Sequence, residues 1–151
     1  MDGTLLASIR PSTQSKIELA WVDRRGVVTT IPGQPVDVEE PDPGWYARTY
    51  GLSPDGNRVA FVAGPSSDVF VRDLASGLDT RLTFDQRVRH GVSWFPTADR
   101  VVYVNGVQVK SGTAGSFVGT VVSQRADGSE TPRDLIEGTM IPRISPDENR
   151  C

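Results

Sequence analysis

A repeated stretch decides the fold: residues 52–62 read LSPDGNRVAFV, and residues 94–104, 42 positions later, read WFPTADRVVYV. Apolar, turn, arginine and strand positions coincide in the two copies. Pro54-Asp55-Gly56 predicts a tight turn, because proline presets φ and glycine accepts a positive φ. The β-branched and aromatic residues after the turn predict a strand, so each copy is expected to begin with two antiparallel strands.

Two further copies of the turn extend this pattern over the whole chain. Residues 144–150 read ISPDENR, 50 positions after the second copy. Residues 2–7 read DGTLLA and match residues 55–60 at an offset of 53. Spacings of 42 to 53 residues are typical of a repeat whose loops vary in length, as in β-propellers.

The copy that starts at Tyr50 predicts four short strands in about 40 residues, which is the size of a propeller blade. These strands are Tyr50–Ser53, Arg58–Ala63, Asp68–Leu74 and Asp79–Phe84. The first copy predicts Leu5–Ile9, Ile17–Asp23 and Val27–Ile31, followed by a long acidic connection over residues 32–44. The last full copy predicts Val101–Val104, Val118–Gln124 and Thr131–Leu135, with a Gly/Ser-rich excursion over residues 105–117.

We therefore expect an all-β fold, a propeller portion of about three four-stranded blades with almost no helix. No window of ten or more residues has a 3.6-residue apolar period. The chain of 151 residues forms one repeat domain, with blades at roughly 2–49, 50–91 and 92–139 and a terminal strand at 140–145. Valine is far commoner than leucine, with 19 copies against 8, which also favours strands.

Charge and composition exclude several classes of function. The net charge is −3 and no basic cluster occurs, so nucleic acid is not an expected partner. No run of 18 apolar residues and no signal peptide is visible, so we expect no membrane partner and leave the compartment open. Cys151 is the only cysteine and cannot form an intramolecular disulfide.

No residue pattern predicts catalysis, a metal or a cofactor. His90 is the only histidine, and no Gly-x-Ser-x-Gly elbow is present. The glycines at 112, 115 and 119 lack the lysine and the helix of a phosphate loop. The aspartates of the repeated turns lack calcium-loop spacing and are interpreted as turn residues: Asp55, Asp99, Asp127 and Asp147.

Two other features have structural interpretations first. The acidic segment Asp37–Asp42 is expected to be a solvated face. Trp94 replaces Leu52 in the repeat and is predicted to be core, whereas Trp45, beside Tyr46, is a candidate for an exposed binding face.

The Ser-Pro-Asp-Gly turn at 53–56, the strands Arg58–Phe61 and Asp68–Leu74, and the Thr-Arg-Leu-Thr segment at 80–83 resemble the TolB-like β-propeller repeat family. Residues 19–26, LAWVDRRG, followed by LSPDG at 52–56, look most like the propeller segments attached to bacterial serine/threonine kinases. The resemblance implies a bacterial source, rings that usually have six or more blades, and binding of a protein or peptide at a channel mouth or rim. It also allows a periplasmic or other extracytoplasmic location.

Three blades leave bare blade faces and strand edges, and these favour association with another chain. Our hypothesis is a non-enzymatic interaction module, a half propeller that dimerises into a six-bladed ring. Met140–Ser145 of one subunit would complete the blade of Leu5–Ile31 in another.

Three alternatives stay open. The first is a hydrolase-like enzyme whose site forms at the ring centre from Asp85, His90 and the Arg87/Arg89 pair. The second is a truncated remnant of a signalling receptor, and the third is a fragment that packs arbitrarily.

Overall fold

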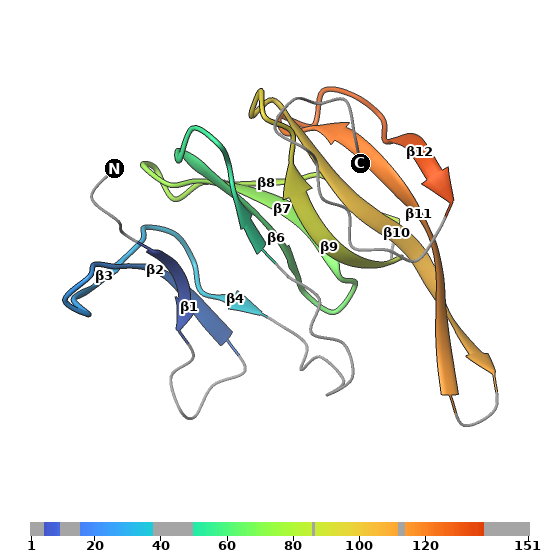
Figure 1. Ribbon diagram of the computed structural model, residues 1–151, viewed down its shortest axis with the longest axis horizontal. Helices are drawn as coiled ribbons and strands as arrows, with labels where there is room; N and C mark the ends of the chain where they lie inside the picture. The colour runs from blue at the N-terminus through green and yellow to red at the C-terminus, as the bar shows by residue number, and fades with distance from the viewer. Residues whose placement is uncertain (1–4, 10–15, 38–49, 86, 112–113, 138–151) are drawn as a thin grey trace.

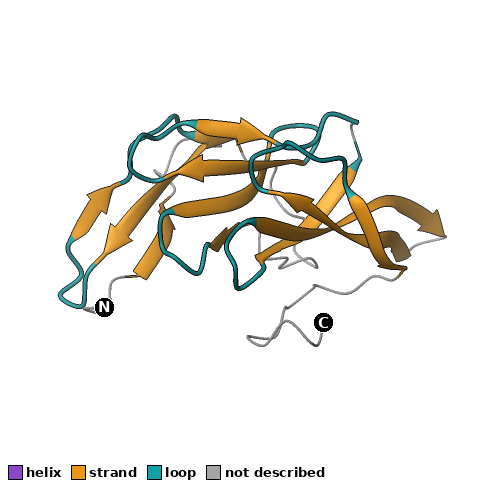
Figure 2. Cartoon of the chain, turned by 90° about the horizontal axis from the view of Figure 1, so that it is seen from above, coloured by secondary structure: helices purple, strands orange, loops and turns teal. Residues whose placement is uncertain are grey.

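The computed structural model describes residues 5–9, 16–37, 50–85, 87–111 and 114–137, and it contains only strands, turns and loops there. The strands form three four-stranded antiparallel sheets that lie side by side in chain order (Figure 1). Figure 2 shows the same sheets from above, with short turns between neighbouring strands of a sheet. Within these ranges no helix is long and apolar enough to cross a membrane. The predicted all-β propeller portion of three blades is confirmed.

The first blade contains an interrupted outer strand. Its elements are β1 (Leu5–Ile9), β2 (Lys16–Val22), β3 (Val28–Thr30) and β4 (Val36–Asp37). Both β3 and β4 pair with β2, at opposite ends of that strand. Pro32 and Pro35 lie between them, and proline cannot donate a ladder hydrogen bond. The segment predicted to be only a connection therefore supplies the second half of the outer strand.

The second and third blades each contain four strands that pair in chain order. The second contains β5 (Tyr50–Leu52), β6 (Arg58–Ala63), β7 (Asp68–Asp73) and β8 (Asp79–Arg81). The third contains β9 (Val88–Trp94), β10 (Arg100–Ser111), β11 (Ala114–Arg125) and β12 (Arg133–Glu137). The third blade takes in β9 from Val88, so this strand straddles the expected blade boundary between residues 91 and 92.

The prediction that residues 105–117 form a Gly/Ser-rich loop outside the strands is wrong. β10 and β11 pair without interruption from Arg100 with Arg125 to Ser111 with Ala114, and form a hairpin that projects beyond the rest of the blade (Figure 1). The pairing includes Gly106 with Gly119. Glycine weakens a strand but does not block the ladder, because its N–H and C=O still pair.

The strand ends also differ by a few residues from the prediction. β8 ends at Arg81, so Phe84, which was predicted in the strand, is exposed beyond it. β12 begins at Arg133 and runs to Glu137, two residues later than predicted. In both blades the outermost strand is held by one neighbour only, so its ends depend on few ladder hydrogen bonds.

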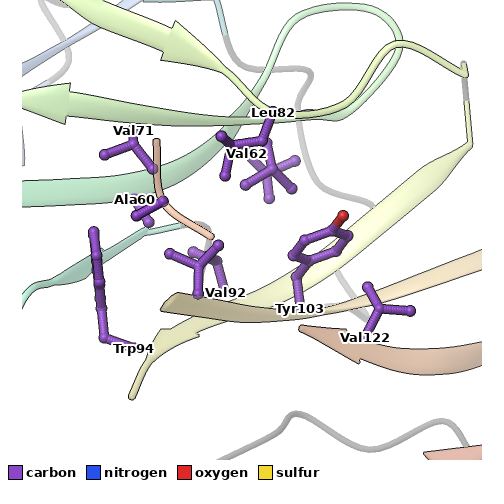
Figure 3. Packing of buried hydrophobic residues seen from close by; sticks show 11 residues of the cluster. Ala60, Val62, Val71, Leu82, Val92, Trp94, Tyr103 and Val122 are labelled. Atoms are coloured by element: carbon purple, nitrogen blue, oxygen red, sulfur yellow. The ribbon is translucent and has the colours of Figure 1, made fainter. Parts of the chain in front are cut away.

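The middle blade is buried on both faces. Val59, Phe61 and Ala63 of β6 pack toward the first blade, in a cluster with Leu19 and Ile31. The alternate residues of β6 pack toward the third blade. That second cluster, drawn in Figure 3, contains Ala60, Val62, Val69, Val71, Leu82, Val92, Trp94, Val101, Tyr103, Val122 and Ala126. Period-2 alternation therefore gives one strand two apolar faces, each covered by a neighbouring blade.

Gly77 brings the backbones of the first two blades together. Its φ is +73°, and a Cβ at this position would lie 2.6 Å from the carbonyl carbon of Pro32 and from the amide nitrogen of Gly33. No real Cβ approaches backbone so closely, so this turn fits only with glycine.

We predict that Gly77→Ala is more destabilising than Gly64→Ala. Gly64 has a similar φ of +76° and open space around it. Its variant should therefore lose only about 1–2 kcal/mol of unfolding free energy, the cost of a left-handed backbone for alanine. Gly77→Ala should lose a further ~1–3 kcal/mol from overpacking between the blades. Urea unfolding of both variants measures the difference. Equal losses would show that the close contact between the blades does not persist in solution.

Candidate functional site

Two seams join the three blades, and polar side chains cross each of them. At the first seam, Arg72 of β7 donates from Nη2 to the carbonyl of Gln34, 2.8 Å away, in the preceding blade. Its guanidinium also pairs with Asp79, with Nε 2.6 Å from Oδ1, and lies over the ring of Phe61. Arg72 is buried, so its charge is compensated by these partners, as a buried cation requires.

The second seam uses Gln124 at the position that corresponds to Arg72. Gln124 Nε2 donates to the carbonyl of Leu82 in the preceding blade, 3.2 Å away, and Oε1 accepts from the hydroxyl of Tyr103 at 2.9 Å. Val101 pairs with Gln124 as Val59 pairs with Arg72, which establishes the equivalence. In the second and third blades, a polar side chain of β7 or β11 thus reaches back to the preceding blade.

Trp94 strengthens the inner side of this seam. Its Nε1 donates to the carbonyl of Gly51 at 2.8 Å, and the guanidinium of Arg58 lies over its ring. The prediction that Trp94 is core is confirmed, whereas Leu52, at the same repeat position, is exposed. Trp45 lies outside the described residues.

A buried charge cluster lies at the second seam and is centred on Asp68 and Arg89. Arg89 Nη1 is 3.3 Å from Asp68 Oδ1 and donates to the carbonyl of Arg87 at 2.7 Å. Arg89 Nη2 contacts Asp85, and Asp68 also pairs with Arg81 at 2.6 Å. The side chain of Arg89 is only 1% exposed, so its charge is held by carboxylates and not by water.

Burial shifts two ionisation equilibria in this cluster. Loss of hydration lowers the pKa of the Arg89 guanidinium, and loss of hydration raises the pKa of Tyr103 to about 12. Arg89 Nε and Asn105 Oδ1 are buried without a hydrogen-bond partner, although these two residues face each other across β9 and β10. The cluster is therefore a structural ion-pair network that is not fully satisfied.

The structure places the four residues of the enzyme alternative as follows. Arg89 is in a strand, and its guanidinium is committed to Asp68 and Asp85. Asp85 and Arg87 are about half exposed and pair with each other at 3.4 Å. His90 belongs to β9, where its backbone pairs with Val104. Arg89 is thus brought together with Asp85, but in a packing role that leaves its guanidinium no surface for a substrate.

The interpretation of the repeat aspartates as turn residues is confirmed for three of them. Asp55 accepts from the Ser53 hydroxyl at 2.5 Å, and Asp99 accepts from the Thr97 hydroxyl at 2.5 Å. Asp127 accepts from the hydroxyl and the amide of Ser129, and these hydrogen bonds lower its pKa to about 2. Asp147 lies outside the described residues. Among the described side chains, no group of three metal-binding residues converges on one point.

A candidate site that the sequence reasoning missed is the far face of the third blade. Ala60 and Val62 of β6 pack on the next blade, and their counterparts 42 residues on, Val102 and Val104, lie on the far face of β10. Val121 completes this separate apolar cluster. Val102, Val104 and Val121 are 0%, 2% and 5% exposed, so this cluster is buried although, among the described strands, no other blade packs on it.

One apolar position of the outer strand is buried in the first two blades and exposed in the third. Ile31 and Leu82 donate their backbone N–H to Leu19 and Val69, and they are 3% and 4% exposed beneath the following blade. Ile136 pairs with Val121 at the equivalent place in the third blade and is 57% exposed. Aligning the outer strands of the three blades could have shown from the sequence that Ile31, Leu82 and Ile136 are equivalent. The loops before these strands differ in length, so the spacing of the repeat does not align them.

We predict that Arg89→Met lowers the free energy of unfolding by about 3 kcal/mol, because it leaves the buried Asp68 with fewer positive partners. Arg87→Met is the matched control: that side chain is mostly exposed, so its loss should stay within about 0.5 kcal/mol. Chemical denaturation compares them. Similar small effects would show that the charge cluster is solvated.

We also predict an alkaline loss of stability that Tyr103→Phe removes. The unfolded chain releases the phenolic proton near pH 10, whereas the folded chain keeps it up to about pH 12. The wild type should thus lose up to roughly 2–3 kcal/mol over that range relative to the variant. Unfolding at pH 9 to 12, compared between the two proteins, measures this. A constant difference would contradict the burial of the hydroxyl.

No protein-family model and no curated protein sequence matches the chain. Solved structures do match it. The chain is similar to "putative TolB" from Agrobacterium tumefaciens, with a TM-score of 0.65 and 18% identity over 95% of this chain and 47% of that one. It is also similar to the tricorn protease, with a TM-score of 0.55 and 13% identity over 87% of this chain and 12% of that one. The chain thus spans less than half of either protein and has the fold of a TolB-like β-propeller segment.

Proposed function

We propose that this chain is a protein-interaction module, a half propeller that associates with a second copy of itself to form a closed ring. The observation that carries the proposal is the exposure of Ile136, whose counterparts Ile31 and Leu82 are both buried under a following blade. A large apolar residue on an apolar sheet face is stabilised by contact with another surface.

A second copy fits the number of blades. Propellers typically have 4–8 blades, so three blades are too few for a ring and two chains supply six. The two contacts between the copies would be equivalent, head to tail, and related by a twofold axis. We further propose that the ring binds a protein or peptide, as the resemblance to TolB-like and kinase-attached propellers implies.

The proposed function is not catalytic. Arg89, the buried member of the alternative enzyme site, is bonded to Asp68, Asp85 and a backbone carbonyl. These contacts leave Asp85, Arg87 and His90 without a buried cation to orient a substrate. Fold alone assigns no chemistry, since propellers accompany both enzymes and binding proteins.

The test is the native mass of a Cys151→Ser variant, which removes the only thiol and hence any disulfide-linked dimer. We expect twice the mass of one chain by size-exclusion chromatography with light scattering, and dissociation on dilution. A monomer at every accessible concentration would overturn the half-ring proposal. So would a ladder of larger species, because it would mean that the contact does not close.

A further inference from the structure

The outer strand of the third blade exposes Leu135 and Ile136, and the first blade of the chain has a surface that matches them in form. In each seam, one turn of a blade covers the outer strand of the preceding blade. It is the turn that joins the outermost strand to its neighbour, that is, β2 to β3, β7 to β8 and β11 to β12. We call it the outer turn: residues 23–27, 74–78 and 126–129 in the three blades. Gly77 of the second outer turn lies against Pro32 and Gly33, and Gly128 of the third lies against Leu82.

The outer turn of the first blade is open around its glycine, Gly26. Gly26 has a φ of +80°, like Gly77 and Gly128 at +73°, but a Cβ there would meet no atom within 4 Å. The hydrogen bond from Asp23 N–H to the carbonyl of Val27 corresponds to the one from Asp73 N–H to Leu78. The turn is thus built like the other two, but no described residue lies against its glycine.

The residues beside this turn have an apolar composition. Because Asp23 and Asp73 make equivalent hydrogen bonds in these turns, Val22 and Val28 occupy the places of Arg72 and Asp79. Val22 pairs with Val28 across the strands, as Arg72 pairs with Asp79. A valine pair thus replaces the ion pair that the second blade turns toward its predecessor. Val28 is 51% exposed and its neighbour Val27 is similarly exposed. The first blade therefore offers an apolar edge where the second offers a charged one.

The opposite end of the chain offers an apolar edge as well. Leu135 and Ile136 are exposed on β12, and Ile136 is the counterpart of the residue that the outer turn of the next blade covers. The turn itself carries Asp23, Arg24 and Arg25, but Val22 and Val28 beside it would lose water favourably on meeting this apolar edge, at about 25 cal/mol per Å². None of the four residues placed in this contact is charged, so their burial leaves no charge unpaired: Val22, Val28, Leu135 and Ile136.

We infer that the contact between two copies joins the outer turn of one, through Val22 and Val28, to Leu135 and Ile136 of the other. This inference rests on the proposed self-association and names its interface. It makes the contact between copies a continuation of the two seams inside the chain, with the valine pair in place of Arg72–Asp79. Because each copy carries both halves, each dimer has two such contacts.

The test uses charge exchange across the contact. Val28→Asp and Ile136→Lys each put one charge into the apolar contact, so each should weaken dimerisation at least roughly tenfold. The chain with both substitutions places Asp opposite Lys in both contacts and should recover most of the lost affinity. Sedimentation equilibrium measures the dissociation constants. Both positions are about half exposed in one chain, so the variants are expected to fold, and circular dichroism checks this.

Leu78→Asp is the matched control, because Leu78 is 71% exposed on the outer turn of the second blade, whose seam is already filled. This variant should dimerise like the wild type. A dimeric wild type that Val28→Asp and Ile136→Lys leave intact would overturn this contact and leave the proposed self-association standing. Failure of the double variant to recover would also overturn it. A monomeric wild type would overturn both.

Discussion

The structure depends on one constraint: a blade of this repeat is apolar on both faces and is therefore stable only between two neighbours. β6 shows it most directly, since Val59 and Phe61 are buried against the first blade and Ala60 and Val62 against the third. A sheet that buries one face can leave the other to water, but a sheet with two apolar faces cannot. The middle blade meets this condition with its two neighbours, whereas in the third blade Ile136 of the outer strand is 57% exposed.

The two internal seams share an apolar core but differ in their polar contacts. Arg72 reaches the carbonyl of Gln34 at the first seam, and Gln124 reaches the carbonyl of Leu82 at the second. The second seam also contains the Asp68–Arg89 pair. A buried charge that meets the wrong face loses its partner, and this costs several kcal/mol. Such contacts therefore disfavour incorrect pairings among blades whose apolar surfaces are otherwise interchangeable.

The sequence predicts the blades well because turn chemistry and strand periodicity are local. The bounds of β6 were predicted correctly from Arg58 to Ala63, and the burial of Trp94 followed from its repeat position. The hairpin at 105–117 was missed, because glycine and serine signal loops locally and only pairing with a partner strand overrides them. The exposure of Ile136 was missed for another reason. Its recognition requires comparing the burial of Ile31, Leu82 and Ile136, and burial depends on contacts between blades that no local pattern contains.

The number of blades also decides whether association by this contact is finite. A head-to-tail contact generates a ring when its rotation closes and an open filament when it does not. In the proposed assembly of this chain alone, each copy adds three blades, so a closed ring would hold a multiple of three. Among rings of 4–8 blades, six is the one size that satisfies this condition, and it takes two copies. If the contact between copies has the same geometry as the two seams inside the chain, the angle between successive blades alone sets the outcome. An angle of a sixth of a turn gives a dimer, an angle of a ninth gives a ring of three copies, and an angle that fits no multiple of three gives strained rings or fibres.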